Sequence, residues 1–281
     1  MNVERLRRPA PIADRADARS PRPSQAGGRA AALTFDNVGV SLAGRTILQD
    51  VSFTIGGGEF GCIIGASGSG KTTLLRLAGG LLAPRSGAVR LGGEVQRGPS
   101  REVAIVFQDY GRALLPWRDV YGNVSLALEA AGVGRGARRA RIEELLTTVG
   151  LQEHMRKYPA ELSGGMQQRV QIARCLAQNP RIILMDEPFG ALDAMTRQTL
   201  QDEILRLAAE RQMTVLFVTH DLEEALYLGD RIVALESNPG RVGRIVEVPL
   251  PRPRDQLSTR EHPDFLKLRR ELFGLMQGHA L

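Results

Sequence analysis

One short segment has the residue types and the spacing of a phosphate-binding loop. Residues 65–73 fit the pattern G-x-x-x-x-G-K-[ST], and they stand between a strand-like run at 60–64 and a helix-like run at 74–78. Glycines let such a loop adopt positive φ and bring backbone N–H groups against phosphate oxygens. The helix N-terminus adds partial positive charge, the lysine reaches the β- and γ-phosphates, and the threonine hydroxyl can bind Mg²⁺. We therefore predict a nucleoside triphosphate site at Gly65, Ala66, Ser67, Gly68, Ser69, Gly70, Lys71, Thr72 and Thr73.

Two adjacent acids follow an apolar, strand-like run at 182–185. Because ligands bind outside the carboxyl ends of buried parallel strands, we expect both acids near the phosphate loop. Asp186 is placed to join a Mg²⁺ shell, and Glu187 to orient and deprotonate a water that faces the γ-phosphate. Acids after a strand can also cap a helix, but Pro188 and a turn follow instead. The pair predicts hydrolysis of the bound nucleotide.

Two further strand-like runs end in polar residues, Gln108 and His220. A glutamine in this position is unremarkable alone, and a lone histidine is usually structural. A histidine at the same sheet edge as Asp186 can, however, hydrogen-bond a γ-phosphate or a catalytic water. Asp221 and Glu224 have the D-x-x-E spacing of a capping box, which predicts the start of a helix. His220 lies outside that explanation, so we predict a catalytic role for it.

A second anion site is predicted where Ser163, Gly164 and Gly165 open a helix. A serine hydroxyl and uncapped backbone amides at a helix N-terminus attract anions. Taken alone, Ser-Gly-Gly is only a helix cap, and one anion site does not require another. The two sites acquire a common function if both hold the same phosphate.

Composition describes an ordinary globular chain of 281 residues, with 43% hydrophobic and 24% charged residues. No run approaches the ~18 apolar residues of a membrane span, and no signal peptide opens the chain, so we expect a cytosolic protein. Cys62 and Cys175 lie far apart in apolar runs, without CxxC or histidine spacing, and are expected to be reduced core residues.

The positive charge is concentrated at the N-terminus. Residues 1–30 carry seven Arg against three acids, which gives +4 of the total +6. This Pro-, Arg- and Ala-rich stretch cannot bury enough apolar surface to order itself, so it is expected to be a disordered tail. A solvated extension is the main interpretation, and contact with acidic lipid or nucleic acid is the alternative.

The rest of the chain has the pattern of short strands, interrupted by a helical insertion at 109–161. Within the insertion four apolar residues recur at i, i+3, i+4 and i+7, which predicts one buried helix face that ends at Gly150: Ile142, Leu145, Leu146 and Val149. Trp117 is expected either in the core or at a partner contact. Strands are expected at 33–35, 47–55, 60–64, 88–91, 103–107, 182–186, 214–219, 232–235 and 244–248.

A second amphipathic helix is expected after residue 193, and a last one is expected to begin near Pro263. Their predicted apolar faces carry Leu200, Ile204, Leu207 and Ala208 in the first, and Phe265, Leu268, Leu272, Phe273 and Met276 in the second. The last helix could pack on its own domain or on a partner.

Residues 33–250 resemble an ATP-binding-cassette (ABC) ATPase subunit. The resemblance rests on the order of five features along the chain: the phosphate loop, Gln108, the segment 162–168, the acid pair Asp186 and Glu187, and His220. The resemblance implies an α/β P-loop NTPase fold, with a RecA-like core, an antiparallel β subdomain and an inserted α-helical subdomain at about 109–175. It places the ATPase domain at 31–255 and a C-terminal helix at 256–281. It also implies a head-to-tail dimer that sandwiches ATP and Mg²⁺. In that dimer the additional nucleotide contacts are Gln108, Ser163, Gly164, Gly165, Gln167 and Asp193, with Thr72, Gln108 and Asp186 around the metal.

Finer features are similar to the nitrate, sulfonate and taurine importer group, namely 106–110, 114–117, 123–124 and 251–255. This similarity implies a bacterial importer with paired permease subunits, a solute-binding protein, and a position on the cytoplasmic face of the membrane. Two residues depart from the family pattern. Met166 stands where many signatures have Gln, and Leu42 where an aromatic residue usually stacks on adenine.

Three other classes of protein fit the sequence less well than an importer subunit. A nucleic-acid or ribosome-associated ABC ATPase would need a coiled-coil insertion or two cassettes, and no nucleic acid is expected as a partner. A small-molecule kinase or GTPase does not explain the Ser-Gly-Gly motif. A binding module without turnover does not explain why both Glu187 and His220 are present.

Overall fold

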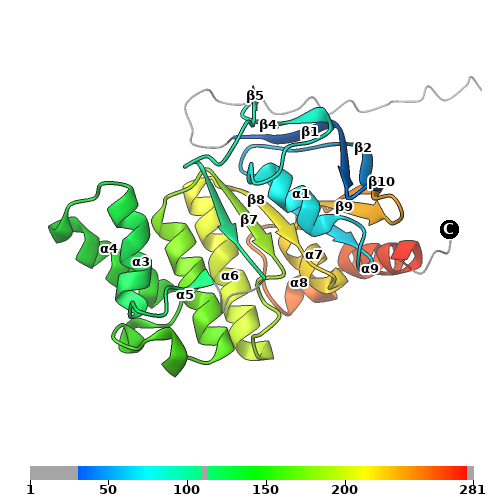
Figure 1. Cartoon of the computed structure of the whole chain (residues 1–281). Helices are drawn as coiled ribbons and strands as arrows, with labels where there is room; N and C mark the ends of the chain where they lie inside the picture. Colours follow the sequence, from blue (N-terminus) through cyan, green and yellow to red (C-terminus); the bar gives the residue numbers. More distant parts are fainter. Residues whose placement is uncertain (1–30, 109–112, 277–281) are drawn as a thin grey trace, which may run out of the picture.

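The structure of the chain is a computed structural model that describes residues 31–108 and 113–276. A six-stranded sheet in the order β10-β9-β3-β8-β7-β6 forms its centre (Figure 1). The strands β6, β7, β8, β3 and β9 are parallel to their neighbours, and β10 runs antiparallel to β9. Their bounds are β3 Phe60–Gly65, β6 Val103–Val106, β7 Ile182–Asp186, β8 Thr214–Val218, β9 Arg231–Glu236 and β10 Arg241–Glu247.

The strands β3, β7 and β8 are buried along their whole length. Continuous apolar runs of this kind are typical of strands covered on both faces of a parallel sheet. The register places Met185 of β7 beside Val106 of β6 and Phe217 of β8. The carboxyl ends of the three strands are therefore level, and the polar residues that follow them lie at one edge of the sheet.

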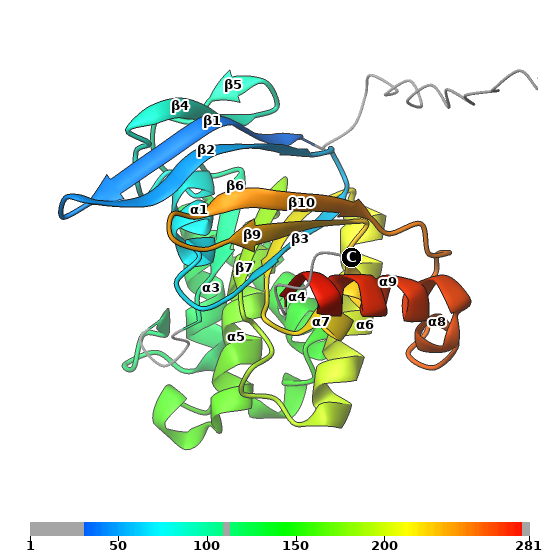
Figure 2. The ribbon, with the colours of Figure 1, turned by 90° about the vertical axis from the view of Figure 1, so that its right-hand side faces the viewer.

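A second, antiparallel sheet in the order β2-β1-β4-β5 lies across the first (Figure 2). It consists of β1 Leu33–Leu42, β2 Arg45–Ile55, β4 Ser86–Leu91 and β5 Glu94–Val95. Helix α1, Lys71–Ala78, lies between the two sheets, since its Leu74 and Leu75 share one buried cluster with Phe35 of β1 and Ile63 of β3. The expected antiparallel β subdomain is present.

Helices cover the other face of the central sheet. They are α3 Val120–Ala130, α4 Arg135–Thr148, α5 Gly164–Ala177, α6 Ala194–Arg211 and α7 Leu222–Leu228, with short 3₁₀ turns η1 Gln152–His154 and η2 Pro159–Glu161. In Figure 1, α3 and α4 lie at the side of the molecule farthest from the antiparallel sheet. The predicted apolar faces of α4 and α6 are buried, and Gly150 follows α4 with φ +64°.

Trp117 lies just before α3 and is 71% exposed. The expectation of a tryptophan in the core is therefore wrong, and the reason lies in the local sequence. Pro116 is exposed too, and Asp119 begins α3 by accepting from the Gly122 N–H at 2.7 Å. The helix thus starts after Trp117. The tryptophan is therefore not part of the helix face that packs on the core.

The C-terminal helices α8, Ser258–Glu261, and α9, Pro263–Met276, pack on the same domain as the rest of the chain. Phe265, Leu268 and Leu272 are buried, as predicted. Phe273 and Met276 are exposed, against the prediction. Phe273 lies one residue past Leu272 and so about 100° further round the helix, while Met276 is the last residue of α9.

Two arginines of the segment 251–255 close the C-terminal end of α7. Arg254 donates to three carbonyl oxygens at 2.6 to 2.8 Å, those of Leu226, Tyr227 and Gly229. Arg252 donates to the carbonyl of Leu228 at 3.1 Å. The Arg254 side chain is fully buried, and burial lowers its pKa to about 10. This segment therefore supplies the partners that the last carbonyls of a helix lack.

The predicted state of the cysteines is confirmed, because Cys62 and Cys175 are both free and buried. Burial raises the pKa of each thiol. The predicted tail at 1–30, the start of the helical insertion at 109–112, and residues 277–281 lie outside the described residues. Within the described ranges, no helix is both long and apolar enough to cross a membrane.

Candidate active site

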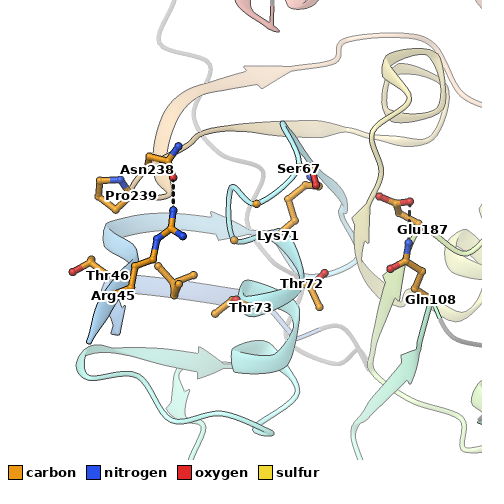
Figure 3. A pocket seen from close by; sticks show the side chains of 13 residues that line it. Arg45, Thr46, Ser67, Lys71, Thr72, Thr73, Gln108, Glu187, Asn238 and Pro239 are labelled. Atoms are coloured by element: carbon orange, nitrogen blue, oxygen red, sulfur yellow. Dashed lines mark hydrogen bonds between the residues drawn. The ribbon is translucent and has the colours of Figure 1, made fainter. Parts of the chain in front are cut away.

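A cleft of about 560 Å³ opens beside α1, at the carboxyl edge of the central sheet (Figure 3). One end is formed by the phosphate loop and by two polar residues that follow β6 and β7. The other end is formed by residues at the start of β2 and in the hairpin between β9 and β10. The lining residues are Ser67, Gly68, Gly70, Lys71, Thr72, Thr73, Gln108 and Glu187 at the first end, and Arg45, Thr46, Ile47, Asn238 and Pro239 at the second.

The phosphate loop has the backbone that its glycines predict. Gly65, Gly68 and Gly70 all adopt positive φ. A Cβ at Gly65 would lie 2.8 Å from the carbonyl oxygen of Leu235, so that position also needs a residue without a side chain. Gly70 begins α1 without any side-chain cap, which leaves the first N–H groups of the helix available to an anion.

Lys71 lies across the loop with its ammonium toward the loop backbone. Its Nζ donates to the carbonyl oxygens of Gly65 at 2.7 Å and Ala66 at 2.9 Å. Burial lowers the pKa of Lys71, while the nearby carboxylates Glu187 and Asp186 act in the opposite direction. The loop therefore holds a desolvated cation against backbone oxygens, where a phosphate could take over those contacts.

Asp186 ends β7 and is 5% exposed. Burial raises its pKa, the charge of Glu187 raises it further, and a hydrogen bond from the Thr72 hydroxyl opposes the shift. Two of the three predicted metal ligands, Thr72 of α1 and Asp186 of β7, thus lie close together. The described residues hold no cluster of three or more His, Cys, Asp or Glu side chains that could bind a metal.

Glu187 stands at the centre of a short chain of polar side chains. Its Oε2 accepts from Gln108 Nε2 at 3.3 Å and lies 3.2 Å from His220 Nδ1. The three predicted residues come from the ends of β6, β7 and β8 and meet at one carboxylate. Glu187 has φ +46°, a strained conformation for a non-glycine residue and one that recurs at functional sites.

The helix start predicted after His220 is confirmed, since α7 begins at Leu222, but the capping box forms only in part. Asp221 caps α7 by accepting from the N–H groups of Glu223 and Glu224. The Glu224 carboxylate does not return to the start of the helix; it accepts from Thr219 Oγ1 at 2.8 Å and from Gln201 Nε2 at 3.2 Å. The Thr219 hydroxyl accepts from the Asp221 N–H instead, at 3.0 Å. Burial raises the pKa of Glu224.

The second predicted anion site lies away from the cleft, because none of the described lining residues belongs to 163–167 or is Asp193. Ser163 caps α5 and accepts from the Met166 N–H at 3.3 Å. Gln167 Nε2 donates to the carbonyl of Pro159 at 2.9 Å. Asp193 caps α6 and accepts from the Thr196 N–H at 3.0 Å. A single copy of the chain does not bring these residues to the phosphate loop.

Sequence reasoning missed the second end of the cleft. Arg45 and Asn238 lie 193 residues apart and are joined by a hydrogen bond of 3.0 Å from Arg45 Nη2 to Asn238 Oδ1 (Figure 3). Residues 238–240, Asn-Pro-Gly, are a turn signal between the strands β9 and β10. That signal could have located the hairpin, but no local pattern shows that it reaches Arg45. Leu42, expected against the base, is 43% exposed and is not among the lining residues.

Comparison with known proteins places the chain in a family. The model of the ABC transporter family matches residues 48–190. The chain is 43% identical over 251 residues to the nitrate import ATP-binding protein NrtD of Synechococcus elongatus, covering 87% of this chain and 91% of the relative. It is 42% identical over 244 residues to the bicarbonate transport ATP-binding protein CmpD of Synechocystis sp., covering 84% and 86%. It is 48% identical over 233 residues to the nitrate import ATP-binding protein NrtC of Synechococcus elongatus. That match covers 82% of this chain but only about a third of the relative, 35% of its length.

Solved structures agree with the sequence matches. A dimeric structure of the ATP-binding cassette MJ0796, in a post-hydrolysis state bound to ADP and Pi, superimposes with a TM-score of 0.68 at 34% identity. It covers 77% of this chain and 98% of that chain. A bacterial Atm1-family ABC exporter with ATP bound gives 0.69 at 25% identity, over 87% of this chain and 42% of that chain. The chain therefore belongs to the ABC transporter family, and it is one of the family's ATP-hydrolysing cassettes.

Proposed function

We propose that this chain powers a membrane importer for a small anion by hydrolysing ATP in the cleft beside α1. The observation that carries the proposal is the meeting of Gln108 and His220 at the Glu187 carboxylate, at the same end of the cleft as Lys71. A carboxylate held by two polar side chains beside a phosphate loop is suited to orient and deprotonate a water.

The roles of the residues follow from these positions. Backbone amides at 67–73 and the Lys71 ammonium hold the triphosphate, which replaces the carbonyl contacts that Lys71 makes now. Glu187 takes the proton of the attacking water. His220 and Gln108 fix the carboxylate through the contacts at 3.2 and 3.3 Å, so that its free oxygen faces the cleft.

Mg²⁺ fits the oxygen donors that the site offers. Thr72 lies close enough to Asp186 to lower the pKa of that carboxyl, and Gln108 lines the cleft with Thr72. Hydroxyl, carboxylate and amide oxygens together with substrate phosphates are the usual ligands of Mg²⁺, which needs only one or two carboxylates. When bound, the ion supplies positive charge that neutralises the phosphate oxygens. Thr72, Gln108 and Asp186 would hold it.

Two copies of the chain complete the site. The segment 163–165, Gln167 and Asp193 lie outside the cleft of their own copy, while MJ0796 in the related structure is dimeric. Gly165 and the turn before Asp193 already lie together, because a Cβ at Gly165 would be 2.9 Å from Leu192 Cδ2. We infer that this joint surface of one copy covers the phosphate loop of the other, with ATP between them.

The catalytic part is tested by Glu187→Gln. The amide keeps the shape of the side chain and loses the proton acceptor, so we expect the hydrolysis rate to fall ~10²–10⁴-fold. ATP binding should remain, and the ATP-bound dimer should persist in light scattering, whereas the nucleotide-free chain should be monomeric or weakly paired. Glu94→Gln, at an exposed glutamate of β5, is the control and should hydrolyse normally. Absence of an ATP-dependent dimer in the Glu187 variant would contradict the shared site.

The permease would dock along α3. Trp117 is exposed three residues before this helix. An apolar groove of about 440 Å³ lies between α3, α5 and the edge strand β6, lined by Phe107, Leu126, Ala127 and Ala130 among others. Phe107 lines this groove and is the neighbour of Gln108, which lines the nucleotide cleft. A movement of Gln108 on ATP binding would therefore be transmitted to a permease helix in the groove. The chain would thus sit on the cytoplasmic face of the membrane through its partner.

Trp117→Ala tests this docking. We expect ATP hydrolysis by the isolated chain and its melting temperature to stay unchanged, since the side chain is exposed. Uptake by the assembled importer should fall, because interface tryptophans cost ~2 kcal/mol or more when truncated. Uptake at the normal level would show that Trp117 is not part of the contact.

The anionic solute is inferred from the relatives, whose names give nitrate and bicarbonate as the transported ions. A permease and a solute-binding protein would select the ion, and this chain would supply the energy. Isolation of the tagged chain from mildly solubilised membranes should recover both partners. Recovery with ribosomes or nucleic acid instead would contradict the importer assignment.

A further inference from the structure

We propose that Arg45 holds the nucleotide base in this chain. It would replace the aromatic residue that usually stands at the position of Leu42. The inference rests on the proposed function, because it assumes that the triphosphate occupies the loop end of the cleft. It assigns the opposite end, formed by Arg45, Ile47 and the 238–239 turn, to the base.

The residues at this end have the chemistry of a purine site. Ile47 supplies apolar surface. Pro239 adds to that surface, and Arg45 supplies a planar cation (Figure 3). A guanidinium stacks on aromatic faces and is more weakly hydrated than an ammonium, so it can cover a base without a large loss of solvation. The cleft therefore offers a flat ring two apolar contacts and one cationic face.

The register of the β1–β2 hairpin explains why position 45 replaces position 42. Leu42 and Arg45 are cross-strand partners, the last pair before the turn. Cross-strand partners project on the same face of a sheet, so the side chains of Leu42 and Arg45 lie on one side of the hairpin. Of these two residues, Arg45 lines the cleft and Leu42 does not.

Asn238 holds the guanidinium in place. The hydrogen bond of 3.0 Å from Arg45 Nη2 to Asn238 Oδ1 ties β2 to the β9–β10 hairpin. The hairpin is itself fixed on β2, because Gly240 N donates to the Ile47 carbonyl at 2.8 Å and Gln49 N donates to the Gly240 carbonyl at 2.9 Å. A long, exposed arginine thus acquires a defined position before any nucleotide binds, which lowers the entropy cost of using it.

Stacking on a ring face does not distinguish adenine from guanine, because both purines present the same kind of surface. Selectivity would require donors and acceptors aimed at the base edge. With Asn238 occupying one amino group of Arg45, we expect the site to accept ATP and GTP with similar affinity.

The experiment compares dissociation constants for ATP, GTP and tripolyphosphate, the last of which lacks base and ribose. Arg45→Ala should weaken ATP and GTP alike by about three- to tenfold, the range of a partly exposed cation–π contact, and leave tripolyphosphate unchanged. Arg45→Tyr should keep ATP within about twofold of the parent, since a ring also stacks. Arg45→Lys should behave like the alanine variant, because it keeps the charge and loses the plane.

Arg85→Ala is the matched control, since Arg85 is an exposed arginine of the same subdomain outside the cleft. It should change none of the three constants. A weaker tripolyphosphate complex in Arg45→Ala would overturn the inference, because Arg45 would then contact phosphate. Unchanged ATP binding would overturn it as well. Lys71→Ala separates the proposals: if it does not weaken tripolyphosphate binding, the proposed nucleotide site itself is wrong.

Discussion

The two ends of the cleft are built in different ways. The phosphate end is one continuous stretch of backbone, residues 65–73, in which three glycines supply the conformation and a buried lysine supplies the charge. The base end is made of side chains from two hairpins that lie 193 residues apart in the chain. Such an end can exchange one contact residue for another, as Arg45 for Leu42, without disturbing the fold.

The ends also differ in what they cost the free protein. At the phosphate end Lys71 and Asp186 are both nearly buried, 9% and 5% exposed, and burial moves both pKa values toward the neutral forms. At the base end Arg45 is exposed and pairs with a neutral amide. The contrast indicates that burial of charged groups at the phosphate end lowers the stability of the free protein. The base end carries no such cost.

Asp186→Asn should sharpen this contrast, and its effect on activity should be large. Loss of a ligand to Mg²⁺ removes several kcal/mol of transition-state stabilisation, so we expect hydrolysis to fall about 100-fold or more. The nucleotide-free variant should nevertheless melt at a higher temperature than the parent at pH 7. Because burial raises the folded-state pKa of Asp186 above 3.8, its charged form destabilises the fold at neutral pH.

The pH dependence gives the sign of that effect. The destabilisation is complete above the folded-state pKa of Asp186, and it disappears as the pH falls through that pKa toward 3.8. The difference in melting temperature should therefore shrink with falling pH. Asp193→Asn is the control, since hydrogen bonds from the start of α6 lower the pKa of that exposed carboxylate. A neutral amide there should not stabilise the chain. A lower melting temperature for Asp186→Asn would contradict the cost assigned to the phosphate end.

Gly240→Ala, a substitution in the hairpin of the base end, should weaken binding at both ends of the cleft. A Cβ at this position would lie 2.2 Å from the Ser69 carbonyl oxygen and 3.0 Å from that of Ile47, both backbone atoms. The hairpin that carries Asn238 would have to move away from the phosphate loop. We expect Kd for ATP and for tripolyphosphate both to rise about tenfold, since forced overpacking costs ~1–3 kcal/mol. Gly98→Ala is the control, because a Cβ there meets no atom within 4 Å. An effect on ATP alone would mean that the loop keeps its shape without the hairpin.

The phosphate end could be predicted from sequence because its requirements are local. Positive φ, a helix N-terminus and a lysine at fixed spacing leave few alternatives to residues 65–73. The convergence of Gln108, Glu187 and His220 could also be predicted, since parallel strands bring their carboxyl ends to one edge. The pattern of strands alone therefore predicts that these three residues, which are distant in the sequence, lie close together.

The base end could not be predicted, because nothing in the sequence around Arg45 or Asn238 records that they meet. The same limitation applies to one detail of α7 and to one error in α9. The Glu224 carboxylate leaves the capping position because Gln201 of α6 and Thr219 offer it buried partners. The prediction of a buried Phe273 is wrong, because this residue lies outside the buried stripe of Phe265 and Leu272 on α9. Periodicity identifies an apolar face, but the neighbouring elements decide how wide a face is covered.

Leu42→Tyr should have the smallest effect, and it tests the base end alone. Leu42 stands opposite Arg45 at the rim and is 43% exposed, so a tyrosine there has room to reach a base held by Arg45. A base–aromatic contact is worth ~1–3 kcal/mol, and a ring that reaches the base from the rim should gain part of it. We expect KM for ATP and for GTP to fall several-fold while kcat stays the same, because stacking acts equally on ground and transition states. In the Arg45→Ala background the same substitution should restore most of the lost affinity, since one stacking surface replaces the other. If Leu42→Tyr changes nothing in either background and the parent discriminates strongly between ATP and GTP, the base does not lie between these two positions.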